Sequence, residues 1–469
     1  MITPAVYFSR FGVLRFVGVA ATVALAIACG GEGAGAPKAA DAVAGTTSAA
    51  AGTGPGTAPN AGGAGGVSTG GAGGGGAATA GASATAGSFS AGSGPTSFEG
   101  TATRPQLAAD AAADYTVLAY LKQAGSVGAP VSDDWDPTAG IGDVAALTPQ
   151  FRVAASGGTH TTVQAAIDAA VAVGGSDRIA IEVAPGTYRE VVCVPSAAPP
   201  ITLYGKSSDA SATVIVFDNY NGKVKAAQTQ ANPCNPALGA TTYGTSGSPT
   251  FAAYAPAFQA KNLTFENDAD ETGISTNVQG VALSTQGDKQ IYENVRLLGN
   301  QDTFFVKSAS ADLIARVYVK SSFIQGDTDF IFGRGTLVID SSEVHFISTR
   351  QGSKGYAVVP STDARNPYGM LIHKTVFTAD AATQAGQVHL GRAWDESGKD
   401  LPSYAAQAAT GVYPNGQALV RECTLGEHIR VSDPWAEAAT TKRPFSAAQG
   451  MYPANRLFEL SNTGPGAAQ

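Results

Sequence analysis

The sequence predicts an all-β fold, a right-handed parallel β-helix (β-solenoid) with a short helical cap at its N-terminal end. From residue 179 onward, short runs rich in Val, Ile, Phe and Thr follow one another, separated by Gly, Asn, Asp and Ser. A small pattern also recurs within these runs, at intervals of about 20 to 35 residues. In a solenoid each coil stacks its inward apolar residues on the next, so such a repeat is typical of stacked coils.

The apolar runs give the expected strands: 179–183, 201–204, 213–217, 257–265, 291–297, 315–324 and 337–339. The repeat is carried by the segments 262–265, 294–297, 322–324, 343–346 and 375–377. Its expected equivalent positions, which recur at irregular intervals, are Leu263, Val295, Phe323, Val344 and Val376. A β-sandwich also uses short strands, but it gives no reason for a recurring Asn-apolar-x-apolar step.

Two helices are expected before the strands. Residues 108–123 combine alanines with Val117, Leu118 and Leu121. Residues 162–173 carry apolar residues at helical spacing, Thr161 or Thr162 can cap their start, and Gly174 with Gly175 stops them. This second helix is expected to cap the N-terminal end of the β-helix.

Residues 1–29 have the pattern of an export signal. Arg10 and Arg15 precede an apolar run from Phe16 to Ala28. A run of this length is too short to span a bilayer, which takes roughly 20 residues, and suits a signal peptide. Small residues before Cys29 resemble a bacterial lipobox, so Cys29 is the expected lipidation site; an ordinary signal peptide cut nearby is the alternative. Either way we expect an exported protein, anchored to the outer membrane as a lipoprotein or extracellular.

Residues 30–100 consist mostly of Gly, Ala, Ser, Thr and Pro, which cannot bury a core, so a disordered linker is expected before a catalytic domain at 101–469. Within the linker, residues 66–70 match the G-x-S-x-G hydrolase motif, but low-complexity flanks cannot build the strand-to-helix turn that the motif requires. The net charge of −8 and the lack of a basic run exclude an electrostatic nucleic-acid binder. The domain is expected to act as a monomer.

Three further cysteines follow, Cys193, Cys234 and Cys423. In an oxidising compartment one disulfide and one free thiol is the simplest arrangement. We expect Cys193 to pair with Cys234, because a bond there would restrain a long insertion. Pairing of either with Cys423, or three free thiols, are the alternatives.

Four polar residues recur at about the length of one coil. Gln279 is followed by Gln301, and Asp302 is followed by Asp329 at a similar interval. In a solenoid this spacing stacks side chains on one face, so we expect the four to meet. Arg392 and Trp394 would join them from a later coil, although Gln279 could instead belong to a structural ladder.

At five places the sequence resembles the pectin methylesterase (pectinesterase) family. The matching motifs occur in the family's order at 186–190, 279–283, 299–304, 329–333 and 390–394. Ala393 stands where the family usually has Pro, Gly280 where it has Ala, and Ser284 where it has Arg. Residues 393–395 and 303–305 are most similar to a subgroup of bacterial envelope lipoproteins.

The resemblance implies a role for each candidate residue. Asp329 would be the nucleophile that forms an acyl-enzyme, with Arg392 keeping it ionised and oriented. Asp302 would be the general acid and then the general base. Gln301 and Gln279 would donate hydrogen bonds to the oxyanion. Trp394, with Phe305 and Phe332, would form the platform for a sugar ring.

The implied activity is hydrolysis of methyl esters in pectin (homogalacturonan), which makes a polysaccharide the expected partner. No metal or cofactor is implied, because every reacting group is a side chain, and the five histidines show no metal-binding spacing. Tyr188 and Glu190 are interpreted as structural. The alternatives are glycosidic cleavage, an esterase or thioesterase acting on another substrate, and a non-catalytic envelope carbohydrate-binding protein. Contact with a membrane is expected only through the lipid anchor.

Overall fold

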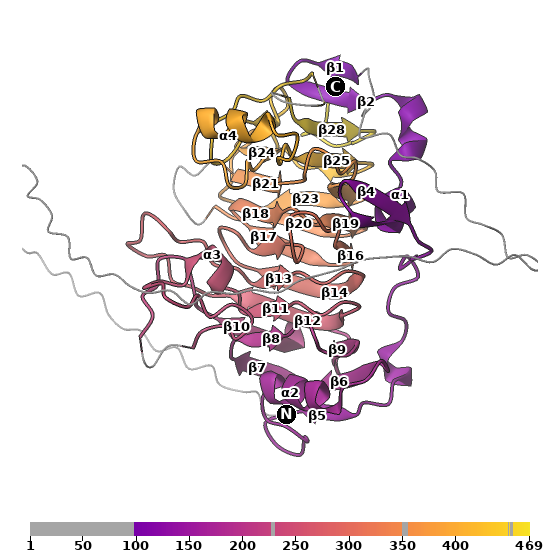
Figure 1. The fold of residues 1–469 in the computed structure, drawn as a ribbon, viewed down its shortest axis with the longest axis vertical. Helices are drawn as coiled ribbons and strands as arrows, with labels where there is room; N and C mark the ends of the chain where they lie inside the picture. Colours follow the sequence, from indigo (N-terminus) through magenta and orange to yellow (C-terminus); the bar gives the residue numbers. More distant parts are fainter. Residues whose placement is uncertain (1–97, 227–229, 349–354, 449, 451–453) are drawn as a thin grey trace, which may run out of the picture. The chain divides into compact units, whose positions relative to one another are not determined.

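The computed structural model describes residues 98–226, 230–348, 355–448, 450 and 454–469. These residues form a parallel β-helix in which the strands of successive coils stack along one axis (Figure 1), which confirms the predicted fold. The expected signal at residues 1–29, including Cys29, and almost all of the expected linker at 30–100 lie outside the described residues. The first described strand, β1 (Phe98–Thr101), begins slightly before residue 101, the expected start of the domain.

Three ladders of parallel strands form the walls of the β-helix. The first contains β5 (Phe151–Val153), β6 (Ile179–Val183), β9 (Ile201–Gly205), the first halves of β12 (Gln259–Asn267) and β14 (Gln290–Leu298), β16 (Arg316–Lys320), β19 (Thr336–Asp340), β22 (Met370–His373), β25 (Gln417–Arg421) and β28 (Arg456–Leu460). The second contains β7 (Gly186–Arg189), β10 (Thr213–Phe217), the second halves of β12 and β14, β17 (Phe323–Gly326), β20 (Glu343–Phe346), β23 (Val376–Ala379) and β26 (Thr424–Leu425). The third contains β8 (Val192–Val194), β11 (Phe251–Ala253), β13 (Leu283–Thr285), β15 (Phe304–Val306), β18 (Thr328–Gly333), β21 (Gly355–Pro360), β24 (Val388–Arg392) and β27 (Trp435–Ala436).

From β12 onward, one left-handed residue on each coil turns the chain from the first ladder to the second. These residues are Asn262, Asn294, Ser321, Ser341, Lys374, Glu422 and Ser461, with φ between 48° and 58°. Asparagine tolerates this conformation better than most residues, which explains the recurring Asn in the sequence pattern. The repeat is therefore a real feature of the coils, set by a turn rather than by the strands alone.

The expected register of the repeat was wrong in three places. Val344 lies opposite Ile324, which lies opposite Leu297, so Val344 points inward but is out of step with Val295. Phe323 lies opposite Arg296 and Val376 lies opposite Glu343, so both point away from the core. The guanidinium of Arg296 lies over the Phe323 ring at 4.6 Å. An apolar side chain that packs on the outside of a coil is indistinguishable in sequence from an inward one, which explains the error.

A ladder of side chains inside the same turn explains the free cysteine. The backbone N–H groups of Val295, Ser322 and Ser342 each donate to the hydroxyl of the next coil, on Ser322, Ser342 and Thr375. The N–H of Thr375 then donates to the Sγ of Cys423 at 3.4 Å. The buried thiol of Cys423 thus stands where neighbouring coils use a hydroxyl, and it is free because Cys193 and Cys234 form the disulfide.

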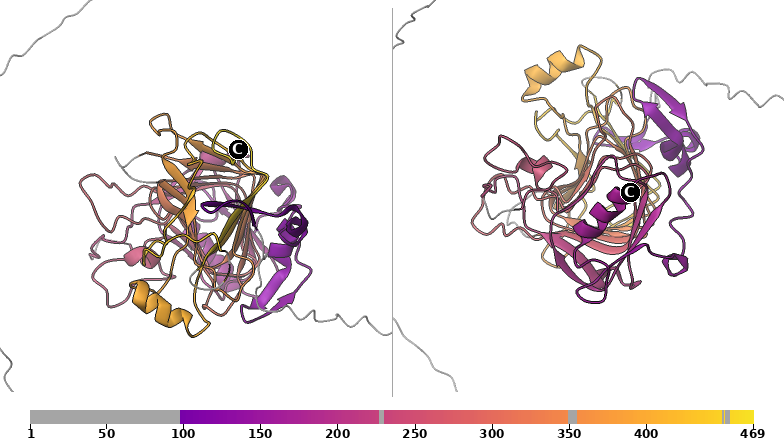
Figure 2. Two further views of the ribbon diagram at one scale, coloured as in Figure 1. Left: turned by 90° about the horizontal axis from the view of Figure 1, so that it is seen from above. Right: turned by 60° about the horizontal axis from the view of Figure 1, so that its bottom comes forward.

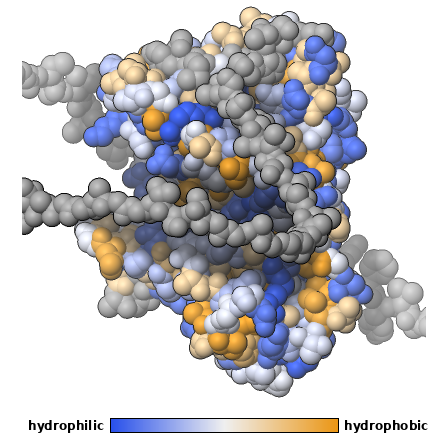
Figure 3. Space-filling view, turned by 45° about the vertical axis from the view of Figure 1, so that its right-hand side comes forward, coloured by the Kyte–Doolittle hydropathy of each residue, from blue (hydrophilic) through white to orange (hydrophobic). Residues whose placement is uncertain are grey.

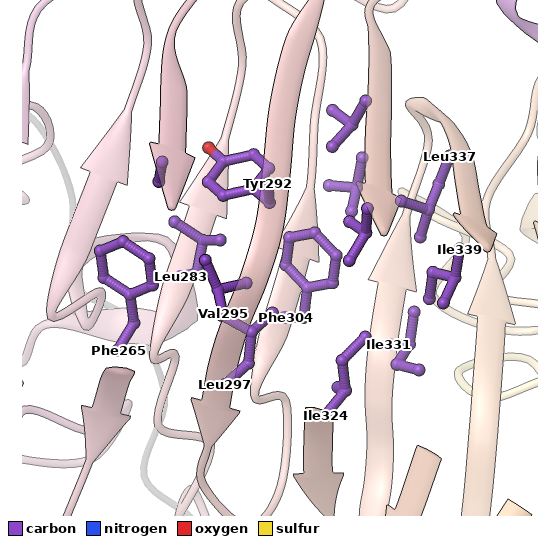
Figure 4. Packing of buried hydrophobic residues seen from close by; sticks show 14 of the residues in the cluster. Phe265, Leu283, Tyr292, Val295, Leu297, Phe304, Ile324, Ile331, Leu337 and Ile339 are labelled. Carbon is purple, nitrogen blue, oxygen red and sulfur yellow. The ribbon is translucent and has the colours of Figure 1, made fainter. Parts of the chain in front are cut away.

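The interior is filled by stacked apolar side chains from all three ladders. Leu283, Phe304, Ile331 and Val358 form one row of the third ladder and are fully buried. Figure 4 shows members of this cluster, among them Leu283, Phe304 and Ile331, pointing into the same interior space. Because inward and outward residues alternate along a strand, the neighbours of these residues face out of the coil.

Helix α2 (Val163–Val173) closes the N-terminal end, as predicted, and lies across the opening of the first coils (Figure 2, right). The Thr162 hydroxyl accepts a hydrogen bond from the N–H of Ala165, and Gly174 ends the helix with φ of 65°. The Glu190 carboxylate accepts hydrogen bonds from the N–H groups of Val163 and Gln164 at 2.8 and 2.9 Å. Glu190 is therefore structural, as expected.

The segment before α2 packs on the outside of the coils. The expected helix 108–123 is interrupted: a 3₁₀ turn (Ala109–Asp114) precedes α1 (Val117–Lys122), because Thr116 caps a new start. Helix α1 packs on the outer face of the first ladder, and a hairpin joins β3 (Gln123–Ser126) to β4 (Ala129–Ser132). Strand β2 (Arg104–Leu107) pairs with β1 and with β28, so this segment also covers the C-terminal end.

Two further helices lie in insertions, α3 (Gly244–Gly247) and α4 (Leu401–Ala408). Asp400 and Ser403 form a capping box at the start of α4. Among the described residues, no helix is long and apolar enough to cross a membrane. Hydrophilic and hydrophobic residues are interspersed on the face shown in Figure 3.

Candidate active site

An open cleft of about 600 Å³ lies on the outer face of the third ladder. Its lining includes Gln279, Gln301, Asp302, Phe305, Asp329, Phe332, Val359, Arg392 and Trp394. These residues come from or directly beside β13, β15, β18, β21 and β24, so the cleft crosses successive strands and follows the axis of the coils. The six residues that were predicted to meet all line this cleft: Gln279, Gln301, Asp302, Asp329, Arg392 and Trp394.

Asp302 and Asp329 occupy equivalent positions on adjacent coils. Phe304 pairs with Ile331, and each aspartate stands two residues before its member of this pair. The N–H of Asp302 donates to the carbonyl of Thr328 at 3.1 Å, which ties the two turns together. The interval from Asp302 to Asp329 is thus one full coil, and this is why two aspartates distant in sequence share one cleft.

Both aspartates have left-handed backbone conformations, with φ of 67° at Asp302 and 52° at Asp329. Strand β18 contains a register shift between Thr328 and Ile331, so Asp329 lies in a β-bulge against β21. Bulges occur beside active sites, where they re-aim a side chain, and non-glycine residues with positive φ are concentrated at functional sites. The local backbone therefore directs Asp329 into the cleft.

Arg392 holds the Asp329 carboxylate from two coils away. Its Nε donates to Oδ1 at 2.8 Å and its Nη2 donates to Oδ2 at 2.7 Å. The two side chains are 10% and 14% exposed, so the pair is largely shielded from water. Burial alone would lower the pKa of Arg392, but the Asp329 carboxylate, with a smaller contribution from Asp302, raises it above its usual value. The pair is therefore a fixed carboxylate–guanidinium ion pair.

Gln301 directly precedes Asp302, and Gln279 stands before β13 on the preceding coil. The N–H of Gly280 donates to the carbonyl of Gln301 at 3.1 Å, and the carbonyl of Gln279 accepts from Asn221 at 2.9 Å. These backbone bonds fix both residues at the rim of the cleft. Among the described residues, the buried side-chain Oε1 of Gln279 has no hydrogen-bond partner, so a structural ladder between described coils does not use this atom.

Three aromatic rings form the floor of the cleft. Phe305 and Phe332 stack with centroids 4.2 Å apart and ring planes at 15°. Trp394 tilts against both, at 6.1 and 5.7 Å. Phe305 and Phe332 are each only 4% exposed, so they support the floor while Trp394, half-buried, offers more of its surface.

Tyr356 lies beneath Arg392 and was not predicted from the sequence. The Arg392 guanidinium lies 3.7 Å from the centroid of the Tyr356 ring, and the same ring stacks on His389 at 5.2 Å. Tyr356 is in β21, the coil between Asp329 and Arg392. The register of the coils places Tyr356 beneath Arg392. No local sequence pattern predicts this position.

One wall of the cleft was also missed, a loop that contributes Asn235, Ala237 and residues 243–247. The disulfide joins Cys193 of β8 to Cys234, directly before this wall. Cys193 pairs with Ala252 of β11 on the third ladder, the ladder that carries the site. The expected disulfide therefore fastens the wall to the sheet that forms the floor.

The structure shows the surroundings of the three departures from the family pattern. A side chain at Gly280 would bring its Cβ to 2.7 Å from Oδ1 of Asn267, whose amide holds the carbonyl of Asn219. Ser284 is buried in β13, opposite Ala252 and Phe305 of the neighbouring coils. Ala393 is fully buried, and its carbonyl accepts from the N–H of Ala439 in the cleft wall. Within the described ranges, no group of three or more His, Cys, Asp or Glu residues is arranged to hold a metal ion.

The fold and cleft define a hydrolase of carboxylic esters on a parallel β-helix. The pectinesterase family model matches residues 150–402. A pectinesterase of Ralstonia solanacearum is 43% identical over 370 residues, which cover 78% of this chain and 92% of the relative. The chain belongs to the pectinesterase family, and the resemblance predicted from its motifs is confirmed.

Solved structures agree with this assignment. The structure of rice weevil pectin methyl esterase matches with a TM-score of 0.67 at 31% identity, covering 79% of this chain and all of that one. Escherichia coli YbhC matches with a TM-score of 0.68 at 28% identity, covering 78% and 96% of the two chains. YbhC carries the description of a putative acyl-CoA thioester hydrolase.

Proposed function

We propose that the protein hydrolyses the methyl esters of polygalacturonate to free carboxylates and methanol, through an acyl-enzyme on Asp329. The observation that carries this proposal is the Asp329 carboxylate, fixed by two hydrogen bonds from Arg392 in a cleft that also holds Asp302. An ionised, oriented carboxylate can act as a nucleophile. Family membership supports the ester substrate.

In the first half of the reaction, an Asp329 oxygen attacks the ester carbonyl carbon, and the electrons of the C=O bond move to its oxygen. The side-chain amides of Gln301 and Gln279 donate hydrogen bonds to this oxyanion, because both line the cleft beside Asp302. When the carbonyl re-forms, the bond to the methoxy oxygen breaks. Protonated Asp302 gives its proton to that oxygen, so methanol leaves and an anhydride remains on Asp329.

In the second half, Asp302 is a carboxylate and accepts a proton from water. The hydroxide that forms attacks the acyl carbon of the anhydride, and the bond to Asp329 breaks. This releases the sugar carboxylic acid, which then loses its proton to bulk water, regenerates the Asp329 carboxylate and restores the proton to Asp302. The two aspartates therefore divide the roles of nucleophile and acid–base.

The form of the cleft supports a polymeric substrate. It is open along the axis of the coils, and its floor is aromatic, which suits stacking against sugar rings. Several bacterial relatives are described as pectinesterases. The same chemistry would also cleave a thioester, so a thioester serves as the competing substrate in the test.

The N-terminal region supports a second part of the proposal. We infer that residues 1–29 direct export, that Cys29 carries a lipid, and that residues 30–100 tether the catalytic unit to the outer membrane. The supporting features are the apolar run before Cys29 and the Gly- and Ala-rich composition after it. The catalytic unit would act as a monomer on a polysaccharide outside the cytoplasm.

The deciding experiment measures methanol released from highly esterified pectin by the wild type and by Asp329→Ala. We expect release by the wild type, loss of release in the variant, and no new reducing ends in either. Reducing ends would indicate glycosidic cleavage instead. Activity on an acyl thioester without activity on pectin would contradict the proposed substrate.

A further inference from the structure

Trp394, the ring of the cleft floor that offers most of its surface, stands on a segment that has left the third ladder. Strand β24 ends at Arg392, and residues 393–396, the platform segment, follow it. The N–H of Trp394 donates to the carbonyl of Pro360 at 2.9 Å. The next residue, Asp395, is fully buried, so its carboxylate lies inside the protein. A carboxylate in such a place requires a charged or hydrogen-bonding partner.

Arg443 is that partner. Its Nε donates to Oδ2 of Asp395 at 3.0 Å, and its Nη2 donates to Oδ1 at 2.7 Å. The two side chains are 1% and 0% exposed, and the hydroxyl of Thr441 also donates to Oδ2 at 2.5 Å. Burial alone would lower the pKa of Arg443, but its contacts with Asp395 raise it above its usual value. The two residues therefore form a charged, two-point ion pair shielded from water.

The pair also fastens a loop that carries part of the cleft wall, residues 438–443. The ends of this loop meet where the N–H of Ala438 donates to the carbonyl of Arg443 at 2.8 Å. The loop lines the cleft at Ala439, whose N–H donates to the carbonyl of Ala393 in the platform segment at 2.8 Å. Two links thus join the 438–443 loop to the platform segment, one backbone hydrogen bond and one buried ion pair.

A ring from helix α4 supports the pair. The Arg443 guanidinium lies over the Tyr404 ring, 4.9 Å from its centroid. Tyr404 is fully buried, and its hydroxyl donates to the carbonyl of Pro414 at 2.7 Å. The two-point contact fixes the orientation of carboxylate and guanidinium, and the ring restrains the plane of the guanidinium. Side chains inside the protein therefore fix the spacing between the platform segment and the 438–443 loop.

We propose that Asp395 and Arg443 are positioning residues that hold Trp394 and the 438–443 loop at the spacing in which a sugar ring of the substrate is bound. This inference rests on the proposed function and assigns residues that determine substrate affinity. Neither of the two belongs to the described residues that line the cleft, so the pair acts on binding through its neighbours. Without it, the ring and the loop must be ordered when substrate binds, which costs affinity.

The test neutralises both partners at once, because removal of one leaves a buried charge without its partner. In Asp395→Asn with Arg443→Gln, we expect KM for highly esterified pectin to rise roughly tenfold and kcat to stay within about twofold. The matched control is Arg104→Gln with Glu459→Gln, a two-point ion pair of similar burial between β2 and β28. It should lower the melting temperature by a similar amount and leave KM unchanged. An equal rise of KM in the control overturns the positioning role.

A second comparison asks whether the pair acts through Trp394. Trp394→Ala should raise KM by itself, and neutralising the pair in that background should add less than about twofold, because the ring that the pair holds is gone. Full additivity overturns the proposal. Thr441→Val is the milder variant if the neutralised pair does not fold. It removes one hydrogen bond to Asp395 and should raise KM about threefold; an unchanged KM overturns the proposal as well.

Binding without turnover separates this inference from the proposed function. In an Asp329→Ala background, calorimetry with a fully methyl-esterified oligogalacturonate should show an affinity that falls about tenfold when the Asp395–Arg443 pair is neutralised. If the wild type releases no methanol but this loss of affinity is found, the esterase is refuted and the positioning role is retained. Methanol release by the wild type, together with an affinity that neutralisation leaves unchanged, retains the esterase and overturns the positioning role.

Discussion

Asp329 and Arg392 are 63 residues apart in the sequence, yet their side chains meet through two parallel hydrogen bonds of 2.8 and 2.7 Å. The planar guanidinium fits both carboxylate oxygens at once, which a lysine ammonium cannot do. The left-handed bulge at Asp329 aims the carboxylate, and Arg392 fixes its rotation. One oxygen can then face the cleft in a constant orientation.

The first prediction concerns this pair. Arg392→Lys keeps the positive charge but removes the two-point contact, so kcat for methanol release should fall by roughly a hundredfold. KM should change little, because the floor that contacts the sugar is intact. Steady-state kinetics on highly esterified pectin gives both values. A drop in KM alone, with kcat preserved, would show that Arg392 does not orient the nucleophile.

The second prediction concerns the proton carrier. Asp302→Asn preserves the size of the side chain but cannot protonate the leaving methanol, so kcat should fall by roughly 10² to 10⁴. Acid catalysis matters less for a good leaving group, so the first-turnover release of nitrophenol from a nitrophenyl ester of galacturonate, which precedes the base-assisted second half, should slow much less than first-turnover release of methanol from the methyl ester. Equal slowing of both first turnovers would indicate that Asp302 does not act as the general acid.

The sequence allowed the coil stack and the meeting of Asp302 with Asp329 to be predicted, because both depend on spacing. The outward positions of Phe323 and Val376 were not predictable, since apolar residues also pack on the outside of coils. Tyr356 was missed for a different reason. It acts through a neighbouring coil, and its register depends on a bulge that no residue pattern announces.

The cleft wall is another feature that sequence alone left undefined. Residues 235–247 follow an expected disulfide, but nothing in their composition shows that they line the site. Their position follows from Cys193, whose strand pairs with the ladder that carries the floor. The covalent bond was thus predictable, whereas its relation to catalysis became apparent only from the stacked strands.

The third prediction follows from that bond. Replacing Cys193 and Cys234 by Ala opens a loop with a sequence separation of 41, which should lower the free energy of unfolding by roughly 2 to 4 kcal/mol. The cleft wall should also loosen, raising KM for pectin with less effect on kcat. Denaturant titration and kinetics test the two effects. Cys423→Ser is the control, because a hydroxyl can serve in the turn ladder, and it should leave KM unchanged.

The fourth prediction concerns the ring beneath Arg392. Tyr356→Leu removes the cation–π contact at 3.7 Å, worth about 1 to 2 kcal/mol in a shielded site, so kcat should fall by roughly tenfold. Tyr356→Phe retains the ring and should keep most of the activity. If both variants lose activity equally, the hydroxyl rather than the ring matters, and the support of Arg392 by stacking is refuted.

The last prediction is a pH dependence of stability that originates far from the aspartates in sequence, at His428. This side chain is 4% exposed. Burial, with a smaller contribution from His345, lowers the pKa of His428 from 6.5 to about 4. Between these values the unfolded chain binds a proton that the folded protein does not, so stability is lost as the pH falls through this window.

We therefore expect the wild type to lose roughly 1 to 3 kcal/mol of unfolding free energy between pH 7 and pH 4 from this histidine. His428→Gln cannot take up the proton, so its stability should depend less on pH across the same range. His160→Gln, at the edge contact with Phe151, is the matched control. Urea titrations at several pH values measure the slopes. Parallel slopes for the wild type and His428→Gln would show that His428 does not contribute, whereas a flatter slope in that variant alone assigns the acid sensitivity to its burial.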